Sequence, residues 1–149
     1  MWDYPRPPRL ELSARRIRVM TASAVIAETT RSYRVLETSH PPVHYVPAED
    51  CAPGTLTSAP GSSVCEWKGR AVYWDVTTSS GTISAAGWSY PDPTRPFAAL
   101  RDHVAFYPSL LACFVDDERV TPQPGDFYGG WVTADVVGPF KGSPGSMFW

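Results

Sequence analysis

The pattern of apolar and polar positions is mostly that of β-strands. It is clearest between residues 65 and 93, where two alternating segments, 70–76 and 82–88, flank the polar turn 77–81. Alternation with a period of two around a short turn with glycine is typical of a β-hairpin. We therefore expect residues whose numbers sum to about 159 to lie opposite each other. This register places Trp74 opposite Ala85 and Ala71 opposite Trp88.

Shorter segments with the same alternation predict further strands. The first three follow one another closely, which favours an antiparallel meander. A proline ends the fourth segment and another separates the last two, because proline cannot donate a ladder hydrogen bond. The predicted strands are residues 16–20, 24–28, 32–37, 43–46, 104–107 and 111–115.

Two stretches interrupt the strand pattern. Residues 48–64 contain two prolines and two glycines in positions that oppose regular structure, which predicts a loop. After the hairpin, Thr94 is placed to cap a short helix near residues 95–103. Phe97, Leu100 and Val104 would lie on one face of this helix.

The predicted fold is mostly β, in one domain of antiparallel, strongly bent sheets built from hairpins. At 149 residues the chain suits a single domain with a substantial core. We expect an N-terminal arm over residues 1–14, a β domain over 15–120 and a C-terminal tail over 121–149. The tail is too rich in aromatic residues for a flexible linker, so it is expected to wrap across the domain, with one helical turn at 133–139.

Composition excludes several classes of partner. The net charge of −2 provides no strong positive field for nucleic acid, and no apolar run approaches the length of a membrane span. The first ten residues contain three prolines and no apolar core, so we do not expect a signal peptide. Three cysteines without a CxxC pair suit a reducing compartment. The expected location is the cytoplasm.

The best candidate site is the open end of the hairpin. The predicted register brings residues 67–69 beside 90–92, so flat aromatic faces would surround one cation, Lys68, and two anions, Asp92 and Glu66. The chain has only two lysines, and each lies between an aromatic residue and a glycine. The alternative is that these aromatic residues belong to the core and that the cation forms an ion pair. The candidate ligand-binding residues are Trp67, Lys68, Trp88, Tyr90, Asp92 and Lys141.

Catalysis is a weaker possibility. Cys65 is three residues from Lys68, and a nearby cation lowers a thiol pKa. His103 would then have to serve as the base, whereas a buried packing role for Cys65 is the simpler interpretation. The chain lacks the common nucleotide-binding, hydrolase and metalloprotease motifs, and its cysteines and histidines have no zinc-ligand spacing. No metal is expected, and no cofactor is predicted.

Four ordered blocks of the sequence resemble the bacterial "domain of unknown function 427" family. They are RVLETSHPPVHYVPAEDC, CEWKGRAVYWDV, AGWSYPDP and HVAFYP, and GDFYGGWVTADVVGPFKGSPG is similar to the tail of longer members. Many members have His-Cys-Pro-Trp-Lys-Gly where this chain has Val64, Cys65, Glu66, Trp67, Lys68 and Gly69. The resemblance implies a single, mostly β domain and no established activity. A nucleotidyltransferase label is sometimes attached to the family, but the carboxylates that hold Mg²⁺ in such enzymes have no evident counterpart here.

Three functions follow from these observations. The first is a domain that binds an unidentified anionic or aromatic small molecule at the hairpin mouth, with the tail closing the site. The second is an enzyme in the same pocket that uses Cys65, Lys68 or Asp92, including nucleotidyl or other group transfer. The third is an interaction module whose aromatic tail docks on a partner or on a second copy in a homodimer.

Overall fold

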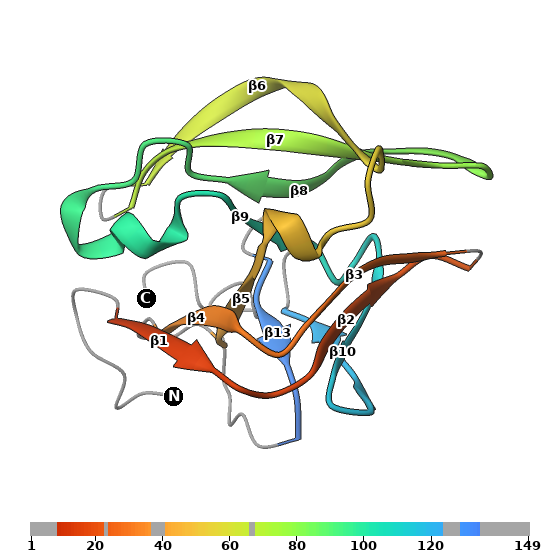
Figure 1. Cartoon of the computed structure of the whole chain (residues 1–149), viewed down its shortest axis with the longest axis horizontal. Coiled ribbons are helices and arrows are strands. Elements are labelled where there is room, and N and C mark those ends of the chain that lie inside the picture. Colours follow the sequence, from red (N-terminus) through yellow and green to blue (C-terminus); the bar gives the residue numbers. More distant parts are fainter. Residues whose placement is uncertain (1–8, 23, 37–40, 66–67, 124–128, 135–149) are drawn as a thin grey trace, which may run out of the picture.

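The described residues of the chain form three antiparallel sheets. The computed structural model describes residues 9–22, 24–36, 41–65, 68–123 and 129–134 (Figure 1). A seven-stranded sheet has the order β1-β4-β5-β9-β8-β7-β6, a four-stranded sheet has the order β11-β10-β2-β3, and β12 pairs with β13. The strands are β1 (Arg9–Ser13), β2 (Ile17–Met20), β3 (Val25–Thr29), β4 (Ser32–Leu36), β5 (Val43–Pro47), β6 (Leu56–Cys65), β7 (Gly69–Thr78), β8 (Gly81–Ser89), β9 (His103–Phe106), β10 (Ala112–Val115), β11 (Glu118–Arg119), β12 (Thr121–Pro122) and β13 (Trp131–Val132).

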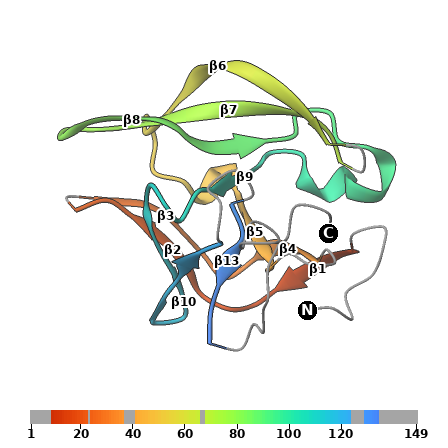
Figure 2. The same cartoon turned by 180° about the vertical axis from the view of Figure 1, so that it is seen from behind.

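The seven-stranded sheet is buried on both faces. One face and the four-stranded sheet enclose an inter-sheet core that includes Ile17, Val46 and Phe106. The opposite face carries a second cluster, which includes Tyr45 and Trp88 and is covered by Phe97 and Leu100. Adjacent residues such as Tyr45 and Val46 lie in different clusters because successive strand side chains point to opposite faces. Figures 1 and 2 show the long strands β6–β8 on one side of the molecule and β1, β4 and the four-stranded sheet on the other.

The predicted hairpin is confirmed as β7 and β8, but its register is only partly correct. Next to the turn, Val76 pairs with Ile83, in agreement with the sum of 159. A bulge follows, so that Trp74 pairs with Gly87 rather than Ala85, and Trp88 pairs with Tyr73 rather than Ala71. The bulge forms because extra residues of β8 loop out of the ladder.

The predicted loop over residues 48–64 is wrong in its second half. Residues 48–50 form the 3-10 turn η1 (Ala48–Asp50), but 56–65 form β6, the edge strand of the large sheet. Pairing of β6 with β7 is interrupted between Ser58 and Ser62, where Pro60 and Gly61 lie. An edge strand tolerates these residues because one of its sides needs no ladder hydrogen bonds.

The expected meander and N-terminal arm also differ from the structure. The hairpin of β2 and β3 is confirmed, but β4 enters the other sheet, where it pairs with β1 and β5. Strand β1 lies within the expected arm, of which residues 1–8 are outside the described part of the chain. The ion pair between Arg34 and Glu11 joins β4 to β1.

The expected short helix is present as the 3-10 element η2 (Arg95–Leu100). Phe97 and Leu100 are buried in the second cluster, as expected for one shared face. Val104 does not share that face, because it belongs to β9 and points into the inter-sheet core. The Thr94 side chain makes no cap hydrogen bond.

The described part of the C-terminal tail packs on the domain. Trp131 is 1% exposed, and its indole N–H donates to the Phe106 carbonyl oxygen at 3.1 Å. Residues 135–149, which contain Lys141 and most of the predicted helical turn, are outside the described residues. None of the helices in the described ranges has the length and apolar character that a membrane span requires.

Candidate functional site

The mouth of the hairpin is held together by the backbone. Cys65 pairs with Gly69, so β6 turns sharply into β7, and the Thr94 N–H donates to the Lys68 carbonyl oxygen at 3.0 Å. Gly69 has a φ of +110°, and a Cβ atom there would lie 3.3 Å from the Asp92 carbonyl oxygen. The two segments that the sequence brings together are therefore in direct backbone contact.

Lys68 is buried at this mouth. The residue is only 8% exposed, and its ammonium nitrogen lies 6.0 Å from the centroid of the Tyr90 ring. Lysine is rarely buried to this extent without compensating interactions, because its charge loses hydration. A cation facing an aromatic ring recovers part of that cost.

An aromatic row extends from Lys68 across the second face of the seven-stranded sheet. We use this name for Tyr90, Tyr45, Trp88 and Tyr107. Successive ring centroids are separated by 6.2, 6.2 and 4.5 Å, distances typical of favourable aromatic contacts. Trp88 and Tyr90 are each 6% exposed, so most of their ring surface contacts other protein groups.

The six predicted site residues are therefore only partly brought together. Lys68, Trp88 and Tyr90 share one face of the sheet. The Asp92 side chain is 96% exposed, and its carboxylate lies 3.6 Å from the Arg101 guanidinium, so it faces solvent at the rim. Trp67 and Lys141 are outside the described residues.

Only some of the candidate catalytic side chains are among the described ones. The Cys65 side chain is outside the described part of the structure, whereas Cys51 and Cys113 are buried. Burial raises the pKa of the Cys51 thiol to about 11, and it raises that of Cys113 further. Both thiols are therefore protonated at neutral pH. Among the described residues, no group of three histidine, cysteine or acidic side chains is placed to hold a metal ion.

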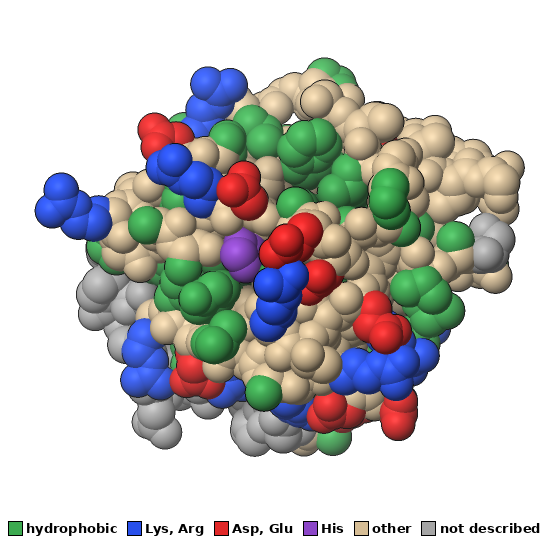
Figure 3. All heavy atoms as spheres, in the orientation of Figure 1, with side chains coloured by type: hydrophobic (Ala, Val, Ile, Leu, Met, Phe, Trp, Pro, Cys, Tyr) green, Lys and Arg blue, Asp and Glu red, His purple; other side chains and the backbone are tan. Residues whose placement is uncertain are grey.

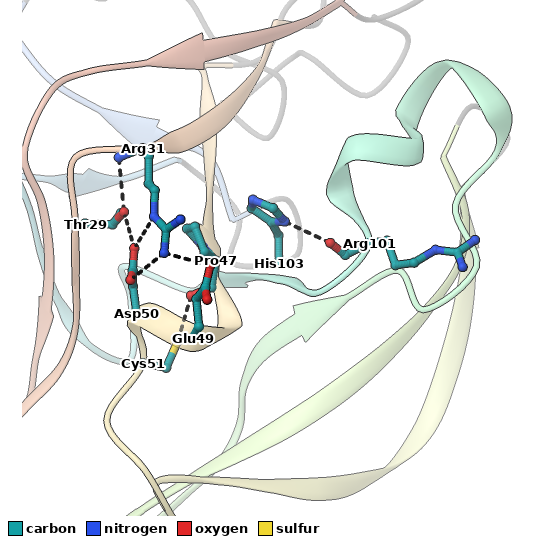
Figure 4. Close-up of polar contacts among 8 residues, drawn as sticks. All are labelled: Thr29, Arg31, Pro47, Glu49, Asp50, Cys51, Arg101 and His103. Carbon is teal, nitrogen blue, oxygen red and sulfur yellow. Dashed lines mark hydrogen bonds and ion pairs between the residues drawn. The ribbon is translucent and has the colours of Figure 1, made fainter.

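His103 lies at the surface beside a charged cluster. Figure 3 shows one histidine between acidic and basic side chains and a group of hydrophobic ones. In the close-up of Figure 4, the Arg101 carbonyl oxygen is 2.9 Å from His103 Nδ1, and Asp50 accepts hydrogen bonds from Thr29 and Arg31. The Arg31 hydrogen bond, followed by that of Thr29, lowers the pKa of Asp50. These contacts join η1 to the chain between β3 and β4, and they indicate a structural role.

A surface hollow that the sequence did not reveal lies at the other end of the aromatic row. It has a volume of about 260 Å³. Its position depends on the β8 bulge and on residues that follow β9, so no local sequence signal marks it. The lining residues are Tyr73, Ser84, Ala85, Tyr107, Ser109 and Leu110.

Comparison with known proteins assigns the chain to one family. No curated protein matches the chain. The sequence pattern described as "Domain of unknown function (DUF427)" matches residues 9–121. This range runs from β1 into β12 and includes Lys68, the aromatic row and the hollow. The chain therefore belongs to the DUF427 family.

Proposed function

We propose that this protein is a small-molecule binding domain whose ligand carries an anionic group that contacts Lys68 at the mouth of the β7–β8 hairpin. The observation that supports the proposal most directly is the burial of Lys68, whose ammonium nitrogen lies over the Tyr90 ring at the end of the aromatic row. Flat apolar surface around a few polar groups is the usual composition of a ligand site.

The energetics favour an anion at this place. An anion close to a buried ammonium is attracted strongly, because the exclusion of water leaves the Coulombic interaction less screened than at the surface. A ligand carboxylate or phosphate beside Lys68 would add a charge-assisted hydrogen bond in a medium of low dielectric constant. We infer that the ligand combines an anionic group with a flat ring.

The two alternative functions have weaker support. The enzyme would use Cys65, Lys68 or Asp92, but the Asp92 carboxylate faces solvent beside Arg101. The Cys65 side chain is outside the described part of the structure, and the described thiols of Cys51 and Cys113 are buried. An interaction module that relies on the tail cannot present Trp131, because this side chain is buried in the inter-sheet core.

Calorimetric titration with benzoate and with inorganic phosphate tests the proposal. Wild-type protein should bind at least one of the two saturably, and Lys68→Met should weaken that binding by about tenfold or more, which corresponds to about 1.4 kcal/mol. Lys68→Arg is the matched control, because it keeps the charge and should retain most of the affinity.

Two results would overturn the proposal. One is the absence of saturable binding of both probes to the wild-type protein, or equal affinity of Lys68→Met. The other is loss of the fold in both Lys68→Met and Lys68→Gln, which would assign Lys68 a structural role instead.

A further inference from the structure

The surface hollow lies on the same face of the sheet as the aromatic row, at the far end from Lys68. Tyr73 lies in β7, and Tyr107 follows β9. Both side chains pack against the second cluster and form the aromatic walls of the hollow. The Tyr107 ring is 4.5 Å from that of Trp88, and the Tyr73 hydroxyl donates to Ser63 Oγ at 2.8 Å. Two ordered phenol rings therefore line the hollow.

The rim of the hollow is a strained but fixed piece of backbone. Ala85, which lies in the bulge, has a φ of +49°, in the left-handed region that residues with a Cβ rarely adopt. The Asp75 carboxylate accepts the Ala85 N–H at 2.8 Å and holds this conformation. Strain of this kind is concentrated at functional sites, where the surrounding structure maintains it.

The lining selects for a neutral ligand. None of the six lining residues carries a charge, and burial raises the pKa of the Tyr107 phenol to about 12, with Tyr73 adding to the effect. Within the described parts of the chain, the hydroxyls of Ser84, Ser109 and Tyr107 have no hydrogen-bond partner. A ligand can therefore find apolar ring surface and several hydroxyl groups here, but no countercharge.

The size of the hollow suits a small ring system. A buried cavity of about 150 Å³ is sufficient for benzene, whereas sites for drug-sized molecules begin at about 300 Å³. The 260 Å³ of this hollow lies between these values. One ring, or two fused rings, fits inside the hollow, and a larger molecule would extend out of it.

We propose that this hollow is a binding site for a neutral, planar aromatic molecule of one or two rings that carries a hydrogen-bonding group, as phenol and indole do. The ring packs against Tyr73 and Tyr107, and its polar group contacts the serine hydroxyls at the rim. The site is separate from the anion site proposed at Lys68 and rests on different observations.

Ligand-observed NMR titration with indole, with phenol as the second probe, tests this proposal. Wild-type protein should bind indole saturably with a dissociation constant of about a millimolar or below, as expected for a molecule of this size. Ser84→Trp places a large side chain from the exposed rim into the hollow and should weaken indole binding by at least about tenfold. Ser79→Trp adds the same side chain at the exposed hairpin turn and should leave binding unchanged.

A third variant separates the two sites. Lys68→Met should bind indole as the wild type does, whether or not it binds benzoate. The proposal is overturned if neither probe binds, if Ser84→Trp binds indole as well as Ser79→Trp does, or if benzoate competes with indole for one site that Lys68→Met removes.

Discussion

At the scale of single residues, the most unusual position is Ala85. It adopts a left-handed backbone conformation without being glycine, and it does so where β8 leaves the regular ladder. For an L-residue this conformation costs about 1–2 kcal/mol, because Cβ approaches the following carbonyl oxygen. The Asp75 carboxylate, which accepts the Ala85 N–H, compensates part of this cost.

Ala85→Gly should therefore stabilise the protein. Glycine removes the left-handed strain but adds about 0.5–1 kcal/mol of backbone entropy to the unfolded chain, so the net gain should be about 0.5–1 kcal/mol. Urea denaturation measures this difference in the free energy of unfolding.

Ala86→Gly is the matched control for this prediction. Ala86 is fully buried in the inter-sheet core and has no positive φ, so its replacement should destabilise the fold by at least about 1 kcal/mol. Equal effects of the two replacements would show that Ala85 is unstrained.

Lys68 and Ala85 show what the sequence can reveal about the site. The closeness of Lys68 and Tyr90 was predictable, because a hairpin brings its two open ends together even when the register is wrong by two residues. The hollow was not predictable, because a positive φ at an alanine leaves no mark in the sequence. Its second wall, Tyr107, comes from a distant part of the chain.

At the scale of elements, the contact between β8 and β9 is unusually close. Gly87 pairs with Phe106, and a Cβ atom at Gly87 would lie 2.9 Å from the Ala105 carbonyl oxygen. That distance is shorter than real Cβ contacts allow, and the obstacle is backbone, which cannot rotate away.

Gly87→Ala should consequently destabilise the protein by about 1–3 kcal/mol, the range found for overpacked interiors. The urea concentration at the midpoint of unfolding should fall, while the slope of the free energy of unfolding against urea concentration stays unchanged. Thr82→Ala, at an exposed position of the same strand, should change stability by at most about 0.5 kcal/mol. A Gly87→Ala variant as stable as the wild type would mean that β8 and β9 lie further apart.

The strands were predictable to different degrees for physical reasons. Strands β2, β3, β5, β7 and β8 were identified by alternation, because apolar side chains on one face of a strand alternate along the sequence with more polar ones on the other face. Strand β6 was missed because proline and glycine oppose central strands but are tolerated at an edge. Sequence also could not show that β4 leaves β3 for the other sheet, because local alternation does not specify the partner of a strand.

At the scale of the whole molecule, several ion pairs link distant segments and make stability depend on pH. Hydrogen bonds from arginines lower the pKa values of Glu11, Asp50 and Asp116 below their ordinary values of 4.5, 3.8 and 3.8. The folded state thus binds protons less readily than the unfolded chain does. The ion pairs therefore stabilise the fold fully at a pH above the ordinary pKa values. This stabilisation is lost as the pH falls through the lowered pKa values of the folded state.

The free energy of unfolding should accordingly decrease as the pH is lowered from 5 through this acidic range, and Asp50→Asn should reduce the size of the decrease. Urea titrations of both proteins at a series of pH values provide the comparison. A variant whose pH dependence matches that of the wild type would show that Asp50 is not among the linked groups.

The placement of β9 has a consequence for how the polypeptide acquires its shape during synthesis. Because β9 lies between β5 and β8, the large sheet remains in two pieces until residues 103–106 have left the ribosome. Until then, β5 and β8 each expose an unsatisfied edge, and such edges promote aggregation. A nascent chain that stalls shortly before this point should therefore need a chaperone, whereas one that has passed it can close the sheet unaided.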